Sequence, residues 1–505
     1  MIANVPSAIL LGVDGSPVSV EVHASNGVPG FSIVGLPDAA VRESRDRVRA
    51  ALLTSGFKWS SKRVTVNLAP SAVRKAGAAL DLPIAMGMLI ASEQIDPEAV
   101  TGCAFFGELG LDGSLRYFPG VIPLVDVVGT PKVVVPAVCL DEASVVPAKE
   151  VYGATSLRQV VDALNGGGGW VLPGSSSTPG QEHEDFPDLA DVRGQPVGRR
   201  AVEVAAAGGH HLLLIGPPGS GKTMLATRLP GLLPPLTFDE SLSVARIRSA
   251  SALSQDGAYL PSRPPFRAPH HSATAVSIVG GGSTWLRPGE ISLAHRGVLF
   301  MDELGEFDRA VLDSLREPLE EGVVRISRVR VSAVLPARFL LVAATNPCPC
   351  GEGMTPGSCR CTPRMRERYL ARLSGPLLDR FDLSVSLAKP QVDDLLCMVP
   401  GESTERVASR VAAARDRAHE RGVSCNAVIP SWALDQLAPM SPDALSLIER
   451  RLRSGVLSAR GMDRIRRVAL TIADLAQDGA LIGAEHVAEA LQLRAARSIV
   501  RTDER

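Results

Sequence analysis

A complete phosphate-binding loop constrains this chain more than any other feature of its sequence. The loop has the pattern G-x-x-x-x-G-K-[ST] and consists of Gly216, Pro217, Pro218, Gly219, Ser220, Gly221, Lys222 and Thr223. An apolar run at 212–215 predicts a buried strand before it, and residues 224–229 predict a helix after it. In such a loop backbone N–H groups meet phosphate oxygens, Lys222 reaches the β- and γ-phosphates, and Thr223 ligates Mg²⁺. We therefore expect ATP and Mg²⁺ here, against the plain alternative of a glycine-rich connecting turn.

Length and composition limit the kinds of protein this can be. The chain has 505 residues, 45% hydrophobic and 21% charged, enough for about three globular domains. No apolar run is long enough to span a membrane, and the first residues lack a basic segment followed by an apolar one, so we expect a cytoplasmic protein with no membrane partner. The formal charge of -1 predicts that any nucleic-acid binding depends on a local basic surface.

Composition divides the chain into three blocks and a linker, and predicts a multidomain α/β protein. Residues 1–164 alternate short apolar strands with helical stretches, which is typical of an α+β domain. Residues 165–187 are rich in glycine, serine, proline and acids and predict a flexible linker. Residues 188–390 form an α/β block that contains the phosphate loop, and residues 391–505 are helical by pattern.

Two further strands end in groups suited to ATP hydrolysis. The apolar run 298–301 ends in Asp302 and Glu303. Asp302 is expected to hold the Mg²⁺ shell and Glu303 to polarise the attacking water, although a core strand capped by surface acids would look the same. A strand at 339–344 leads to Asn346, whose amide can orient that water without adding charge. Together these residues favour hydrolysis over phosphoryl transfer.

Three arginines complete the predicted nucleotide site, Arg380 as a catalytic residue and Arg460 and Arg464 as nucleotide-binding residues. Arg380 follows an apolar pair, and an always-charged guanidinium is what a neighbouring subunit would insert against a γ-phosphate. The alternative is a surface arginine paired with Asp379 or Asp382. In the helical block Arg460 and Arg464 lie four residues apart on one helix face. Arg460 is the first candidate for sensing the nucleotide from the lid and Arg464 the second.

Four of the eight cysteines crowd into fourteen residues, as Cys348, Cys350, Cys359 and Cys361. Four thiolates complete a tetrahedral Zn²⁺ site, and the glycines and proline between them let the loop fold back. The spacing C-x-C-x₈-C-x-C departs from the usual two-residue knuckle and leaves less room at one ion. Free structural thiols and a redox pair are the alternatives.

Three longer strings resemble a known family. They are Phe266–His271, Arg287–His295 and Asn346–Gly351. With the phosphate loop, the acidic strand and the arginines in this order, the chain resembles AAA+ ATPases of the magnesium chelatase-like branch, and within it the ComM/YifB family. The resemblance covers essentially the whole chain. It implies a Lon-protease-like (ribosomal S5 domain 2-like) N-terminal domain, an AAA+ core and a C-terminal helical lid. It also implies homo-hexameric rings that act as ATP-driven DNA helicases on single-stranded or branched DNA, promoting branch migration when incoming DNA recombines.

The resemblance also raises two other functions. A magnesium chelatase-type metal-insertion ATPase would need a partner with a metal-binding domain that this chain lacks. A protease-like regulator is the other, but Ala79 stands where the Lon family carries its nucleophilic serine, and the lysine position falls near Ile122, so proteolysis is not expected. Segments 279–285 and 323–334, the latter with Arg325, Arg328 and Arg330, match the pore-facing insertions of this branch; exposed hairpins that make subunit contacts are the alternative.

Overall fold

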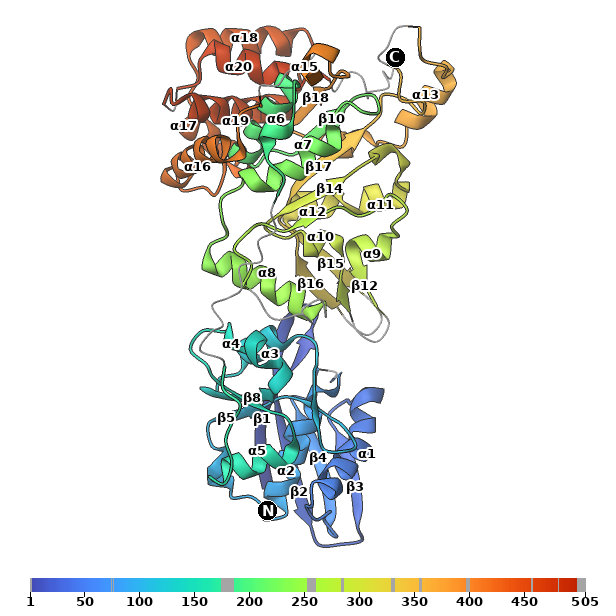
Figure 1. Cartoon of the computed structure of the whole chain (residues 1–505), viewed down its shortest axis with the longest axis vertical. Helices are drawn as coiled ribbons and strands as arrows, with labels where there is room; N and C mark the ends of the chain where they lie inside the picture. Colours follow the sequence, from blue (N-terminus) through green and yellow to red (C-terminus); the bar gives the residue numbers. More distant parts are fainter. Residues whose placement is uncertain are drawn as a thin grey trace.

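The computed structural model shows a multidomain mixed α/β protein with parallel sheets (Figure 1). The described residues are 2–73, 75, 77–173, 186–251, 260–282, 286–327, 332–353, 357–396, 400–455, 457–479 and 481–496. The molecule is elongated, with an N-terminal unit at one end, the phosphate-loop unit in the middle and a helical unit at the other end (Figure 1). Arg328, Arg330 and most of the predicted linker lie outside the described residues.

The N-terminal unit contains two sheets with helices between and around them. One sheet has the order β1-β2-β4-β3, from Ile2–Leu11, Asp14–Ser25, Arg63–Ala69 and Gly30–Val34, and the other is β5-β8-β9, from Cys103–Phe105, Lys132–Pro136 and Glu150–Ala154. A small ribbon pairs β6 (Glu108–Leu109) with β7 (Leu115–Arg116). The helices are α1 (Ala39–Thr54), α2 (Asp81–Ala91), α3 (Val121–Val127), α4 (Leu140–Ser144) and α5 (Leu157–Leu164).

Local sequence explains why these elements form where they do. Asp38 begins α1 by accepting a hydrogen bond from the Val41 N–H at 2.8 Å, which satisfies one of the free donors of the first turn. Every residue of α2 is buried, in agreement with its continuous apolar sequence. In β4 buried and less buried residues alternate, so one face packs on the core of this unit.

The central unit is built on a five-stranded parallel sheet with the order β11-β14-β17-β10-β18. In chain order its strands are β10 (Leu212–Ile215), β11 (Phe266–Arg267), β14 (Val298–Met301), β17 (Leu340–Thr345) and β18 (Leu383–Ser386). The helices are α6 (Pro196–Gly208), α7 (Lys222–Arg228), α8 (Phe238–Ala250), α9 (Ala275–Val279), α10 (Glu290–Leu293), α11 (Arg309–Ser314), α12 (Arg316–Glu321), α13 (Pro363–Leu370) and α14 (Gly375–Leu378). Because β10, β14 and β17 are adjacent and parallel, their carboxyl ends meet at one edge of the sheet.

Two hairpins project from this unit. One pairs β12 (Gly280–Gly281) with β13 (Arg287–Pro288), and the other pairs β15 (Val323–Ser327) with β16 (Ser332–Pro336). Both lie at the end of the central unit that faces the N-terminal unit (Figure 1). A Cβ added to Gly12, in the turn between β1 and β2, would lie 2.9 Å from the Ala333 Cβ, so this turn packs directly on β16.

The last unit is helical, as its pattern predicts. It contains α15 (Val392–Leu396), α16 (Thr404–Glu420), α17 (Leu434–Leu437), α18 (Pro442–Arg453), α19 (Ala459–Ala476) and α20 (Ala484–Gln492). Helix α18 ends at Arg453, and α19 begins at Ala459. Gly455 takes a left-handed φ of 70°, and the Ser458 side chain then begins α19 by accepting from the Gly461 N–H.

A tight junction joins the N-terminal unit to α8. The Gly120 N–H donates to the Ser249 carbonyl at 3.0 Å, and the Ile122 N–H donates to the Ser249 Oγ at 3.2 Å. Leu242 and Ala245 of α8 belong to the same apolar cluster as Ile122, with Ala79 packed against it. Ala79 and Ile122 therefore both take part in apolar packing here.

Glu142 makes this junction sensitive to pH. Burial raises the pKa of the Glu142 carboxyl to about 7, although a hydrogen bond with Ser249 of α8 opposes the shift. The pKa of Glu142 is about 7 in the folded protein and 4.5 in the unfolded chain, so the folded state holds this proton more tightly. The stability that comes from this difference is fully present below pH 4.5 and is lost as the pH rises to about 7. We expect Glu142→Gln to stabilise the protein at pH 8 by up to about 3 kcal/mol and to change little at pH 4.

Thermal unfolding at the two pH values measures this effect. The matched control is Asp141→Asn, which changes an exposed carboxylate one residue earlier on α4. If wild type and Glu142→Gln lost stability equally between pH 4 and pH 8, Glu142 would not be the source of the pH dependence.

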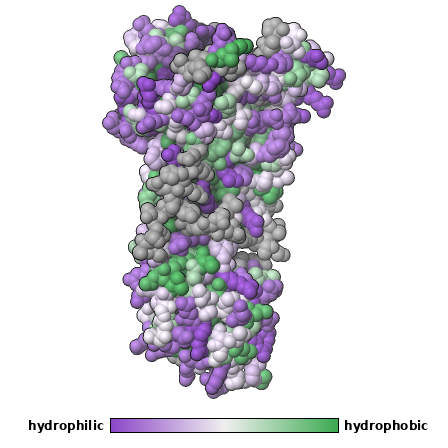
Figure 2. Space-filling model, viewed as in Figure 1, coloured by the Kyte–Doolittle hydropathy of each residue, from purple (hydrophilic) through white to green (hydrophobic). Residues whose placement is uncertain are grey.

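The surface is mainly hydrophilic on the face shown in Figure 2, with apolar atoms gathered on the N-terminal unit close to the junction. Within the described part of the chain, no helix combines the length and the apolar character needed to cross a membrane.

Candidate functional site

The carboxyl edge of the central sheet brings together residues that are far apart in the sequence. Ile215, which precedes the phosphate loop, is aligned with Thr345, and Met301 is aligned with Ala343. Lys222 and Thr223 at the start of α7 therefore face Asp302 after β14 and Asn346 after β17. The order of strands in the sequence predicts this meeting, and the structure shows the contacts that result.

The Lys222 ammonium and the Thr223 hydroxyl already contact the other two strand ends. Lys222 Nζ donates to the Gly216 and Pro217 carbonyls at 2.7 and 2.9 Å and to Asn346 Oδ1 at 3.1 Å. Thr223 Oγ1 donates to Asp302 Oδ2 at 2.8 Å. Burial lowers the pKa of Lys222, and the charges of Asp302 and Glu303 oppose that shift.

The loop itself fits a nucleotide phosphate chain and its metal ion. Gly219 and Gly221 adopt φ of 78° and 85°, a region that glycine enters without strain, and a Cβ at either position would meet nothing within 4 Å. Ser220 Oγ is buried and has no hydrogen-bond partner among the described residues. Thr223 and Asp302 supply the hard oxygen ligands that Mg²⁺ prefers. Bound Mg²⁺ would neutralise charge on the phosphates at this edge.

Glu303 is held by contacts that the sequence pattern does not show. Its backbone is left-handed, with φ 52° and ψ 47°, which costs a non-glycine residue about 1–2 kcal/mol. Its N–H donates to Asp302 Oδ1 at 2.9 Å, which stabilises this turn. The His271 Nδ1 lies 2.9 Å from Glu303 Oε2. The carboxylate is thus half exposed at the sheet edge, with an imidazole beside it.

His271 is a residue of this site that the sequence analysis did not select. It follows β11 in the string Phe266–His271. Because β11 pairs with β14, the loop after β11 reaches the end of β14 and places His271 on Glu303. The sequence signal that was available is a histidine shortly after β11, the strand that pairs with β14.

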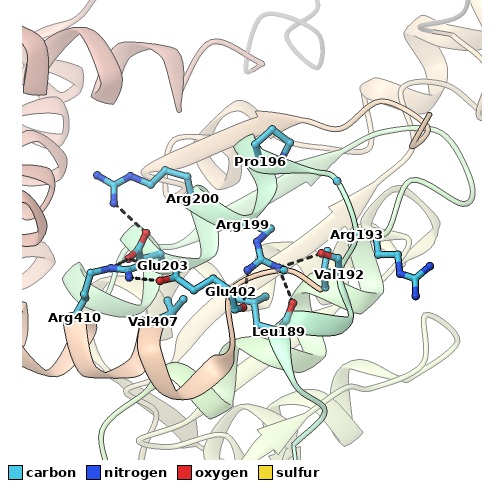
Figure 3. A pocket seen from close by; sticks show the side chains of 12 residues that line it. Leu189, Val192, Arg193, Pro196, Arg199, Arg200, Glu203, Glu402, Val407 and Arg410 are labelled. Carbon is cyan, nitrogen blue, oxygen red and sulfur yellow. Dashed lines mark hydrogen bonds and ion pairs between the residues drawn. The ribbon is translucent and has the colours of Figure 1, made fainter. Parts of the chain in front are cut away.

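One cavity adjoins the phosphate loop, and a second lies beside the first. One, of about 370 Å³, lies at the phosphate loop and is lined by Gly219–Met224, by Asp191–Arg193 and by Gln195 and Pro390. The other, of about 420 Å³, lies between α6 and α16 and shares Val192 and Arg193 with the first (Figure 3). Figure 3 shows that Arg410 reaches Glu203 and Glu402, while Arg199 donates to backbone carbonyls.

The larger cavity lies where the central unit meets the C-terminal helical unit. Arg410 pairs with Glu203 at 2.7 Å and Glu402 at 2.6 Å, and Arg200 pairs with Glu203 at 3.0 Å and with Glu489 of α20 at 2.7 Å. These guanidinium groups pair with protein carboxylates, so they link the helical unit to α6 beside the phosphate-loop cavity.

Arg380 lies at the opposite edge of the sheet from the phosphate loop. It precedes β18, whose first residue Leu383 is aligned with Leu212 at the start of β10. The β10 strand has four residues, so the two edges are about 13 Å apart. Arg380 forms an ion pair with Glu320 of α12.

Arg460 and Arg464 lie with Arg380 and not at the phosphate loop of the same chain. Arg464 Nη1 donates to the Arg380 carbonyl at 2.8 Å and to Asp382 Oδ1 at 3.0 Å. Burial, and then the positive charges of Arg464, Arg460 and Arg316, lower the pKa of Arg380. Neither Arg460 nor Arg464 lines the cavity at the phosphate loop. We call Arg316, Arg380, Arg460 and Arg464 the arginine cluster.

The four cysteines come together in space. The Sγ atoms of Cys348, Cys350, Cys359 and Cys361 all lie within 4.8 Å of one another. Cys348 is buried and Cys350 is exposed, so the cluster sits at the surface just beyond Asn346.

Comparison with known proteins identifies the family. Models of magnesium chelatase subunit ChlI match residues 188–395 and 20–138, and the model of its C-terminal part matches residues 401–494. Competence protein ComM of Haemophilus influenzae is 44% identical over 98% of this chain and 97% of its own length. The uncharacterized protein YifB of Escherichia coli K12 is 44% identical over 96% of this chain and 95% of its own.

These matches agree with the geometry of the site. The longest family match spans the phosphate loop, the acidic strand, Asn346 and Arg380, and its family consists of AAA+ ATPases, which use ATP and Mg²⁺. The relatives are similar over nearly the whole chain rather than over the nucleotide site alone. The chain therefore belongs to the magnesium chelatase-like ComM/YifB family of AAA+ proteins.

Proposed function

We propose that this protein is the subunit of an ATP-hydrolysing homo-hexameric ring that acts on DNA, as a helicase that promotes branch migration in recombination or natural transformation. The observation that carries the proposal is the position of the arginine cluster. Lys222, Asp302, Glu303 and Asn346 lie at one edge of the sheet, and Arg380 lies at the other. In a ring, the sheet edge that carries Arg380 in one subunit faces the sheet edge that carries Lys222 in its neighbour. This contact completes the nucleotide site.

Within this ring each residue has a defined role. Lys222 and the loop N–H groups bind the phosphates, while Thr223 and Asp302 hold Mg²⁺. Glu303 polarises the attacking water and Asn346 orients it. Arg380 of the adjacent subunit stabilises charge on the γ-phosphate. Arg460 and Arg464 lie on the same side of the interface as Arg380, because Arg464 donates a hydrogen bond to the Arg380 carbonyl. Their sensing role is thus proposed across the interface.

The DNA substrate is supported by the relative and by the hairpins. The Haemophilus relative is named a competence protein, and competence is the state in which cells take up DNA. The β12–β13 and β15–β16 hairpins lie where the central unit faces the N-terminal unit, so a channel through the ring would pass them (Figure 1). Arg325 is not a free phosphate contact, because it pairs with Glu317 at 2.8 Å and with Glu321. Arg328 and Arg330 lie outside the described residues, so their contacts with DNA phosphates stay a prediction from the sequence.

The N-terminal unit is proposed as a non-proteolytic scaffold. Ala79 lies in a short 3₁₀ helix at Ala78–Leu80, and Ile122 is buried on α3. A hydroxyl nucleophile and an amine base are needed for acyl transfer, and neither side chain provides one. A Lon-protease-like domain here would connect partner or DNA to the motor through α8.

The rate of ATP hydrolysis with different additives tests the function. We expect single-stranded DNA and a branched DNA junction to raise the rate several-fold, with the gain falling as salt rises because the contacts are to phosphates. Unfolded protein and porphyrin serve as the comparison, and Lys222→Ala reports any contaminating ATPase. If DNA neither bound nor raised the rate, the motor proposal would be wrong. Sizing with ATP and branched DNA then tests the hexamer.

A further inference from the structure

We propose that Cys348, Cys350, Cys359 and Cys361 bind one Zn²⁺, and that this metal holds the loop after Asn346 against the phosphate loop. The proposal goes beyond the motor function, because it concerns what keeps the nucleotide site in shape. It rests on the positions of four sulfur atoms and on the contacts of the loop that carries them.

The sulfur atoms are placed as a single tetrahedral ion requires. Zn–S bonds of about 2.3 Å put thiolates about 3.8 Å apart at the corners of a tetrahedron. Cys348 Sγ lies 3.4 Å from Cys350 Sγ and 3.7 Å from Cys359 Sγ, and the Cys350 and Cys359 sulfurs are 3.6 Å apart. Cys361 Sγ completes the group within 4.8 Å. A cluster of several iron atoms would sit between its thiolates and hold them further apart.

Glycines let the backbone turn tightly enough for Cys348 and Cys350, which are separated by one residue, to reach the same ion. The Gly351 N–H donates to the Cys348 carbonyl at 2.9 Å, which closes a turn around Cys350. Gly351 has φ 80°, and a Cβ added at Gly353 would lie 3.0 Å from Cys348 Sγ. The backbone therefore passes close to the sulfur atoms, which lets one intervening residue suffice.

The first half of the cysteine loop contacts the nucleotide site at two points. Cys348 is buried two residues after Asn346, whose Oδ1 accepts from Lys222. A Cβ added at Gly351 would lie 2.5 Å from Pro218 Cδ, so the loop rests directly on the phosphate loop. Glu352 pairs with Lys389 at 2.7 Å, next to Pro390 in the wall of the cavity.

The second half of the loop leads into α13, which supports the same strand. Arg366 of α13 hydrogen-bonds to Cys359, and this cation offsets part of the negative charge of four thiolates. Tyr369 Oη lies 3.4 Å from Thr345 Oγ1 at the end of β17. A Cβ on Gly305, just beyond Glu303, would lie 2.6 Å from the Tyr369 ring. One metal ion thus joins α13 to the segment between Asn346 and the phosphate loop.

Metal analysis of the full-length protein, purified without a histidine tag, tests the site itself. We expect one zinc per chain in the wild type and in Cys103→Ser, which changes a buried cysteine outside the cluster. The double variant Cys348→Ser/Cys359→Ser is expected to lose the zinc. Iron in place of zinc, metal-free wild type, or zinc retained by the double variant would each overturn the proposal.

Binding of a fluorescent ATP analogue tests the coupling to the nucleotide site. We expect the zinc-free double variant to bind about tenfold more weakly, with Cys103→Ser unchanged. Because the double variant could also unfold, removal of zinc from the wild type with a chelator that is then washed out provides a second test, with circular dichroism to check that the protein stays folded. ATP affinity should fall about tenfold and return when zinc is added back. Unchanged affinity in the folded, zinc-free protein would contradict the coupling.

Discussion

Replacing Glu303 with glutamine is expected to stop ATP hydrolysis while leaving ATP binding intact. The carboxylate lies at the sheet edge where it can polarise water, and loss of a positioned general base lowers rates by about 10²–10⁴-fold. Binding should survive because Lys222, Thr223 and Asp302 make their contacts without Glu303. The measurement is single-turnover hydrolysis together with titration of a fluorescent ATP analogue.

The control for this experiment is Glu306→Gln, three residues later in the same turn. Glu306 pairs with Arg372 at 3.1 Å and does not reach the phosphate-loop cavity. The Glu306→Gln variant should hydrolyse ATP at close to the wild-type rate. Wild-type turnover by Glu303→Gln would remove Glu303 from its proposed role as the base.

Replacing Arg380 with alanine is expected to give the second large effect. In the assembled ring hydrolysis should fall by about 10³–10⁵-fold, the range seen when an arginine that stabilises phosphoryl-transfer charge is supplied or withheld. ATP binding by the isolated subunit should be unchanged, because Arg380 lies at the far edge of its own sheet. Steady-state hydrolysis is measured at protein concentrations where sizing shows the ring.

Arg309→Ala is the matched control for the loss of one guanidinium group. Arg309 is exposed on α11 and makes a 3.7 Å pair with Asp313. It should assemble and hydrolyse ATP normally. A drop in ATP affinity for the isolated Arg380→Ala subunit would show that Arg380 acts within its own chain, against the proposed arrangement.

The nucleotide site could be predicted from the sequence because each part is a short string at the end of an apolar strand. Adjacent parallel strands carry those strings to one edge, so Lys222, Asp302 and Asn346 meet without any further information. The cysteine cluster was likewise visible in the spacing, and the family was visible in the three longer strings. Local pattern was sufficient wherever the partners lie at strand ends.

Side-chain partners from distant elements could not be predicted in this way. The contact of His271 with Glu303 depends on β11 lying beside β14, and the pair of Arg380 with Glu320 depends on where α12 packs. Arg325 appeared to be a free cation in the sequence, yet carboxylates of α12 neutralise it. An ion pair between distant helices and strands cannot be recognised from a short stretch of sequence.

The break between α18 and α19 could not be predicted from the helical pattern of residues 391–505. Periodicity alone does not register Gly455, which has a left-handed backbone. The break matters for the site, since it starts α19 afresh at Ser458 and so places Arg464 on Asp382 and the Arg380 carbonyl.

Mixing two inactive variants tests most directly whether the site is completed across subunits. An Arg380→Ala subunit keeps Glu303, and a Glu303→Gln subunit keeps Arg380, so one of the two kinds of mixed interface has every group it needs. When equal amounts of the two variants assemble at random, about one interface in four pairs the intact Glu303 of one subunit with the intact Arg380 of the next. The mixture should therefore recover about a quarter of the wild-type rate of ATP hydrolysis. If the mixed rings stayed as inactive as either variant alone, each chain would carry its whole site, and completion of the site by a neighbouring subunit would be contradicted.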